Sequence, residues 1–145
     1  NYAGQPWKTQ YWSREVMNRL YKPTADGYCG DEDNGQTSAW YVFSAMGFYP
    51  VCPATDEYVL GAPLFKKVTL QLENGKEVII NAPNNSEGNK YVQKLKWNNS
   101  TYTKNYINHF DLLKGTVLDF DMNNTPNNQR GTSASSYPYS YSTSK

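Results

Sequence analysis

Three consecutive acids stand in the stretch Gly27-Tyr28-Cys29-Gly30-Asp31-Glu32-Asp33-Asn34-Gly35-Gln36. No Lys or Arg occurs between Lys22 and Lys66, so these charges are not neutralised by nearby residues in the sequence. The glycines allow backbone angles that other residues avoid, and we therefore expect a tight, shaped loop. The apolar run Ser-Ala-Trp-Tyr-Val-Phe-Ser-Ala-Met that follows at residues 38–46 predicts a helix over residues 36–46.

The acidic stretch has two interpretations, and its residues alone do not choose between them. Asp31 and Asp33 are two residues apart, so in an extended chain their side chains point to one side and Glu32 points away. Two carboxylates held close together make one of them a stronger base, which suits acid–base chemistry near neutral pH. Alternatively, Asp33 or Asn34 caps the helix that begins near Gln36, and no chemistry is needed.

The two predicted helices differ in how much of their surface is apolar. Residues 5–21 show one broad apolar face, with Arg14 and other charges mostly elsewhere, and Lys22-Pro23 ends this helix. The helix over residues 36–46 is apolar nearly all round, which is typical of a helix buried inside a larger protein. We expect a further part of the protein to cover it.

The rest of the chain changes to a strand-like period, so the predicted fold class is α+β. Alternating apolar and polar residues and an Asn74-Gly75 turn indicate an antiparallel β-sandwich. Strands are predicted at residues 57–62, 67–72, 77–81, 91–97, 101–105 and 116–122. The predicted parts are residues 1–53 with the helices and acidic loop, residues 54–122 with the sandwich, and residues 123–145 as a C-terminal extension. This last part has little to bury, so it is predicted to be poorly ordered or to form one edge strand through Tyr137, Tyr139 and Tyr141.

Composition excludes some classes of function. The 145 residues carry a net charge of +1, which indicates no nucleic-acid surface, and no apolar run reaches the roughly 20 residues of a membrane span. Asn1 is not an initiator Met, so we expect the chain to begin inside a longer polypeptide. Cys29 and Cys52 are too few for a disulfide framework, and we expect them to be free, mostly buried thiols.

The acidic stretch and the aromatic run after it resemble the signature of glycoside hydrolase family 92. Three further segments resemble the same family, namely residues 2–7, residues 58–65 and residues 109–115. The resemblance extends from the first residue to about Met122. It implies a calcium-dependent, inverting, exo-acting α-mannosidase of α-1,2 type that acts on terminal α-mannosides of glycans such as N-glycans. The two helices would be the last members of an (α/α)6 barrel.

The resemblance also implies roles for individual residues. It places the general base on the acidic loop, with Asp33 as our first choice and Asp31 as its partner and alternative. Glu32 would be a calcium ligand, and Trp40 and Tyr41 would line the substrate pocket or belong to the barrel core. The family's general acid is a glutamate upstream of the acidic motif, so we expect this chain alone to be inactive.

The implied partners are the remainder of the same polypeptide, namely an N-terminal β-sandwich and the other barrel helices. No nucleic acid and no membrane span are expected. The implied location is secreted or periplasmic in a bacterium, with attachment to the outer membrane through the N-terminal part.

Two other functions compete with the enzyme hypothesis. The chain could be a non-catalytic β-sandwich that binds glycans through surface aromatics, or a scaffold without sugar contacts. A binding module would place aromatics on an exposed face of its sheet. His109, the one histidine, lies between predicted strands away from the acids, and we interpret it as structural.

Overall fold

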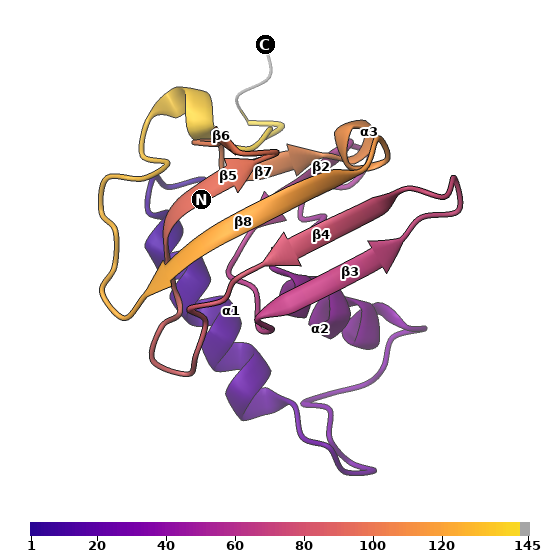
Figure 1. The fold of residues 1–145 in the computed structure, drawn as a ribbon. Helices are drawn as coiled ribbons and strands as arrows, with labels where there is room; N and C mark the ends of the chain where they lie inside the picture. Colours follow the sequence, from indigo (N-terminus) through magenta and orange to yellow (C-terminus); the bar gives the residue numbers. More distant parts are fainter. Residues whose placement is uncertain (143–145) are drawn as a thin grey trace.

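A computed structural model describes residues 1–142 as two long helices packed on two β-sheets (Figure 1). Helix α1 covers Pro6–Leu20 and helix α2 covers Gln36–Met46, so both predicted helices are confirmed. Pro6 suits the first turn of α1 because that position lacks an intrahelical partner for its N–H in any case. Gly47 ends α2 in a left-handed conformation (φ 101°), and its N–H donates to Phe43 O and Ser44 O.

The strands form one three-stranded and one five-stranded sheet. The smaller sheet has the order β1-β2-β7, from Phe48–Tyr49, Glu57–Leu60 and Tyr106–Asn108. The larger sheet has the order β3-β4-β8-β5-β6, from Lys67–Gln71, Glu77–Asn81, Thr116–Asn123, Tyr91–Trp97 and Ser100–Thr101.

The larger sheet is mixed, so the predicted antiparallel arrangement is wrong for one pair of strands. Strand β8 pairs antiparallel with β5 but parallel with β4. Its residues Leu118, Phe120 and Met122 are all buried, which favours the central position between two neighbours. Strands β4 and β5 therefore run in opposite directions on the two sides of β8.

The predicted strand over residues 101–105 is also wrong, because β6 ends at Thr101 and β7 begins at Tyr106. Asn105 between them is buried, and its N–H donates to Ser136 O rather than to a neighbouring strand. A short helix, α3 (His109–Leu112), follows β7 and was not predicted. Its cap is Asn108, whose side chain accepts from Phe110 N at 2.9 Å.

One hydrophobic core joins the helical and strand parts of the chain. Phe48 of β1 is buried in the same cluster as Ile80, Leu95 and Leu118 of the larger sheet, with Phe43 of α2 packed against it. Strand β1 pairs with β2, and these strands lie on either side of the predicted division at residue 53. The helices and sheets therefore pack as neighbours and not as separated parts.

Residues 124–142 are packed against the sheets, which differs from the expected poorly ordered extension. They include a short 3-10 helix at Ala134–Ser136, and no strand is assigned around Tyr137, Tyr139 and Tyr141 among the described residues. Arg130 donates to Asn105 Oδ1 at 3.1 Å and to two backbone carbonyls. The segment is held mainly by polar hydrogen bonds, which an apolar sequence pattern cannot reveal.

Candidate active site

The acidic loop forms a tight turn at the start of α2. Asp33 and Asn34 have positive φ angles of 53° and 57°, so the chain does not continue extended through Asp33 as the sequence suggested. Gln36 N donates to Asp33 O and Thr37 N to Glu32 O, each at 3.2 Å. The loop is thereby fixed to the first turn of the helix.

Glu32 points to the helix, whereas the two aspartates beside it are exposed. Its Oε1 accepts from Ser38 N at 3.2 Å, and its Oε2 is buried without a hydrogen-bond partner among residues 1–142. Ser38 Oγ in turn lies 2.6 Å from Tyr28 OH. Glu32 therefore does the capping that was expected of Asp33 or Asn34, since the N-cap residue Gly35 has no side-chain bond.

Of the three consecutive acids, Asp31 and Asp33 are exposed. Within residues 1–142 neither carboxylate makes a hydrogen bond or an ion pair, and the helix start uses only their backbone carbonyls. Both side chains are thus free to accept hydrogen bonds from water or from a ligand.

Aromatic side chains surround a hollow of about 580 Å³ beside this loop. Its lining includes Tyr21, Tyr28, Ser38 and Tyr41, and Ser38 is the residue whose N–H binds Glu32. Tyr41 lines the hollow, whereas Trp40 is stacked on Tyr21 with ring centres 5.7 Å apart. The hollow brings three tyrosine rings to the side of Ser38, the residue that binds Glu32, whereas Asp31 and Asp33 are not among its described lining residues.

Tyr21 is a lining residue of the hollow that was not predicted from the sequence. Tyr21 is the C-cap residue of α1, and its ring packs at 4.9 Å from that of Tyr41. Its hydroxyl donates to Thr37 O at 3.3 Å, which joins the ends of the two helices. The sequence did contain one indication of this role, namely an aromatic residue directly before Lys22-Pro23, where the first helix ends.

The loop fits calcium only in part. Calcium takes six to eight oxygen ligands, and the buried unpartnered Oε2 of Glu32 is one suitable oxygen. Within residues 1–142 no group of three or more His, Cys, Asp or Glu side chains is placed to hold a metal ion. A calcium ion at Glu32 would therefore take most of its ligands from oxygens other than clustered carboxylates of residues 1–142, such as carbonyls and water.

The remaining reactive side chains are one histidine and two cysteines, of which Cys29 lies in the acidic stretch itself. His109 Nδ1 lies 2.8 Å from Tyr58 OH, a hydrogen bond consistent with the structural role expected for it. Cys29 and Cys52 are free thiols as expected, but Cys29 is exposed and Cys52 only partly buried.

Comparison with known proteins identifies the family. A family model described as the catalytic domain of glycosyl hydrolase family 92 matches residues 1–124. The chain belongs to glycoside hydrolase family 92. The resemblance, which extends to about Met122 in the sequence, is thereby confirmed over residues 1–124.

Solved structures of family 92 proteins share this fold. An inverting mannosidase from Bacteroides thetaiotaomicron is 56% identical, with a TM-score of 0.91 over 97% of this chain and 19% of its own. An α-mannosidase from the same organism is 39% identical, with a TM-score of 0.92 over 97% of this chain and 19% of its own. This family 92 chain therefore spans about a fifth of the length of these relatives.

A curated relative extends the comparison to a fungus. An uncharacterized secreted glycosidase from Arthroderma benhamiae is 27% identical over 125 residues, which cover 84% of this chain and 16% of that protein.

None of the helices described for residues 1–142 has the length and apolarity that a bilayer span requires.

Proposed function

We propose that this chain is part of an exo-acting enzyme that releases mannose from terminal α-mannosides with inversion, and that Asp33 is its general base. The observation that carries the proposal is that the carboxylates of Asp31 and Asp33 are exposed and make no hydrogen bond or ion pair within residues 1–142. They lie in the same loop as Tyr28, which lines the aromatic hollow. Two relatives with 56% and 39% identity are named as mannosidases of this family.

Inversion requires two carboxyl groups on opposite sides of the scissile bond, roughly 6.5–9.5 Å apart, with room for water. Asp33 takes a proton from this water as the water oxygen bonds to the anomeric carbon. Asp31 is the proposed partner and alternative base, and the turn at Asp33 removes the extended geometry that would have put both side chains on one side. The bond to the leaving oxygen breaks, and a protonated carboxyl group from another part of the protein donates a proton to that oxygen.

The aromatic residues of the hollow have separate roles in this proposal. Tyr41 presents its ring to the sugar and Tyr28 holds Ser38 in place through their 2.6 Å contact. Trp40 supports the wall from behind through its stacking on Tyr21. These roles place the sugar C–H surface against apolar rings and its hydroxyl groups near the acids.

We propose that the enzyme binds calcium and that Glu32 is one of its ligands. Its Oε2 would be one ligand, with Oε1 kept in position by Ser38 N. When bound, the ion contributes positive charge that binds sugar hydroxyl groups and stabilises a distorted ring. The chain's own contribution is to hold this carboxylate oxygen dry and fixed at the helix start.

The proposal extends to substrate and location. We assign the enzyme to α-1,2-linked mannosides of glycans, N-glycans included, and to a secreted or periplasmic site of action in a bacterium, with attachment to the outer membrane. The relative named as a secreted glycosidase supports export. The proposed partners of this chain are the terminal α-mannosides themselves and the other barrel helices and N-terminal sandwich of its own polypeptide.

The alternative of a non-catalytic module that binds glycans on its sheet face has less support. A hollow of about 790 Å³ on the larger sheet is lined mainly by charged and amide side chains, including Lys67, Lys94 and Lys96. Phe120, the aromatic among its described lining residues, is buried. Among the described residues that line this hollow, none presents an exposed ring of the kind such a module needs.

A graft tests the proposal because the fold matches closely. Residues 1–145 would replace the matching fifth of the inverting mannosidase from Bacteroides thetaiotaomicron. We expect the graft to hydrolyse α-1,2-mannobiose and Asp33→Asn to lower kcat by about 10²–10⁴-fold.

The matched control is Asp26→Asn, which removes another exposed acid from the same loop. Equal losses in both variants, or full activity in Asp33→Asn, would contradict the assignment. Proton NMR of the first-formed anomer checks inversion, with β-mannose as the expected initial product.

A further inference from the structure

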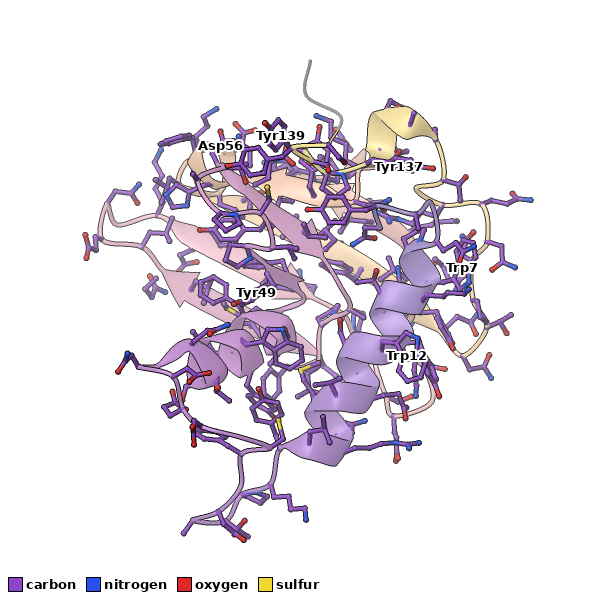
Figure 2. All side chains as sticks on the ribbon, turned by 180° about the vertical axis from the view of Figure 1, so that it is seen from behind. Trp7, Trp12, Tyr49, Asp56, Tyr137 and Tyr139 are labelled. Carbon is purple, nitrogen blue, oxygen red and sulfur yellow. The ribbon has the colours of Figure 1, made fainter. Side chains whose placement is uncertain are left out.

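The opposite end of the molecule carries two adjoining hollows of about 420 and 490 Å³. They share the segment Ala54–Glu57 and the side chain of Phe110, so together they form one groove. Tyr139 and Tyr141 line one half, and Phe43, Tyr58 and His109 line the other. Asp56 and Tyr139 lie together in Figure 2, far from the loop that joins α1 to α2.

Exposed aromatic rings gather in this groove. Phe110 is 62% exposed and Tyr139 is 38% exposed, although each belongs to a residue type that proteins usually bury. The ring of Tyr141 packs edge-on against Tyr139 at 5.4 Å, and its hydroxyl donates to Pro53 O at 2.8 Å. The rings are therefore held in place while part of their surface remains open to solvent.

The walls of the groove come from three parts of the chain that hydrogen bonds fix together. Asn108 caps α3 with Oδ1 and donates from Nδ2 to Asp56 Oδ2 at 2.5 Å, which positions Phe110. Glu57 Oε2 accepts from Tyr139 N at 2.7 Å, which ties the C-terminal segment to β2. The groove thus exists before any ligand binds.

The charges of the groove determine what can occupy it. Asp56 Oδ1 and Glu57 Oε1 accept no hydrogen bond within residues 1–142, and no Lys or Arg side chain is among the lining residues described there. An anionic ligand would meet only like charge. A ligand with many donors and flat apolar patches would satisfy both the carboxylates and the rings.

A neutral oligosaccharide has this combination of hydroxyl donors and C–H faces. We infer that the groove along Phe110, Tyr139 and Asp56–Glu57 is a second glycan-binding site, separate from the acidic loop. The choice of mannose-containing glycans rests on the proposed function, whereas the groove itself does not. Two adjoining hollows suit at least two sugar units, so a longer chain should bind more tightly than a monosaccharide.

The test is calorimetric titration of the full 145-residue chain with α-1,2-mannotetraose, α-1,2-mannobiose and methyl α-mannoside. We expect affinity to rise with chain length, and Phe110→Ala and Tyr139→Ala each to weaken tetraose binding about tenfold, which corresponds to ~1.4 kcal/mol. Both rings are exposed, and unchanged thermal unfolding would show that the variants fold normally. Phe65→Ala is the matched control, because Phe65 is 52% exposed and lies outside the groove.

Several outcomes would overturn the inference. These are no binding of the tetraose at tens of millimolar, an equal loss in Phe65→Ala, or tighter binding of a trilysine peptide that depends on Phe110. Asp33→Asn separates the two sites, since it should leave calorimetric binding unchanged even though it strongly lowers kcat in the graft. Loss of binding in Asp33→Asn would place the sugar in the acidic loop instead.

Discussion

Asp31, Glu32 and Asp33 are neighbours in sequence but differ in what their carboxylates contact. Glu32 is half-buried and bonded to Ser38 N, whereas the side chains of Asp31 and Asp33 are exposed and unpaired among residues 1–142. The positive φ of Asp33 turns the chain into the helix and leaves these two acids at the surface. Acids that contribute no side-chain bond to the fold are available for chemistry.

We expect the calcium dependence of the enzyme's activity to involve Glu32. In the graft we expect a chelator to abolish turnover, calcium to restore it, and Glu32→Gln to raise the calcium concentration needed by at least about tenfold, because one charged ligand is lost. The measurement is initial rate against free calcium. An unchanged calcium requirement in Glu32→Gln would show that Glu32 only caps the helix.

Tyr102 should control part of the stability at alkaline pH. Burial raises the pKa of Tyr102 well above its usual value, and its hydroxyl donates to Tyr106 O at 2.8 Å. The unfolded chain releases this proton near pH 10 but the folded chain retains it, so stability falls as pH rises above about 10. Tyr102→Phe should lose roughly 1 kcal/mol at neutral pH but show a shallower alkaline fall.

Urea unfolding at a series of pH values compares the two proteins. The other tyrosines contribute to the pH dependence of the unfolding free energy in both proteins. The difference between the two pH dependences therefore isolates Tyr102. Parallel curves for Tyr102→Phe and the unchanged chain above pH 10 would contradict the assignment.

Some residue-level features could not be predicted from sequence. Arg14 was expected away from the apolar face, yet it is only 2% exposed and donates to Pro63 O, Asn85 Oδ1 and Ser86 O. These partners lie 49 to 72 positions away, so no local pattern indicates them. The acids of the loop, by contrast, were identified because their charge is not neutralised within the local sequence.

At the scale of elements, helices were predicted better than strands. Helical periodicity and the Pro and Gly boundaries are local signals, and they gave α1 and α2 to within a residue. The parallel pairing of β4 with β8 depends on contacts across about forty residues, and alternation shows only which side of a strand is buried. The short helix α3 has too few residues to show a period.

Gly47 should be required where α2 joins β1. Its φ is 101°, and an added Cβ would lie 3.0 Å from the backbone N of Pro63. We expect Gly47→Ala to lower the free energy of unfolding by at least about 1 kcal/mol, because both strain and crowding act. Gly88→Ala is the control, since a Cβ added there would meet nothing within 4 Å and its φ is not positive. Equal stability of the two variants in urea unfolding would contradict this explanation.

At the scale of the whole molecule, the apolar surface around the acidic loop is incompletely covered. Val42 of α2 is 55% exposed, and Leu20 and Tyr28 are each 46% exposed. The sequence predicted that a further part of the protein covers α2, and the exposure of Val42 supports that proposal. The identity of the covering surface could not be derived from these residues.

The isolated 145-residue chain should therefore be inactive. It contains the proposed base, but the other barrel helices and the acid that protonates the leaving group would come from the rest of the enzyme. Release of mannose from α-1,2-mannobiose by the isolated chain, abolished by Asp33→Ala, would show that the catalytic groups are all present in it. Mannose release that persists in the Asp33→Ala variant would instead indicate a contaminating mannosidase.

The most direct test of Asp33 as the base is chemical rescue in the graft. Asp33→Ala should lose turnover of an activated aryl α-mannoside, and added azide should restore it with β-mannosyl azide as the product, because azide attacks without needing a base. The control Asp26→Ala should retain hydrolysis and gain nothing from azide. Mannose as the sole product of Asp33→Ala, with no increase in rate on adding azide, would contradict the assignment.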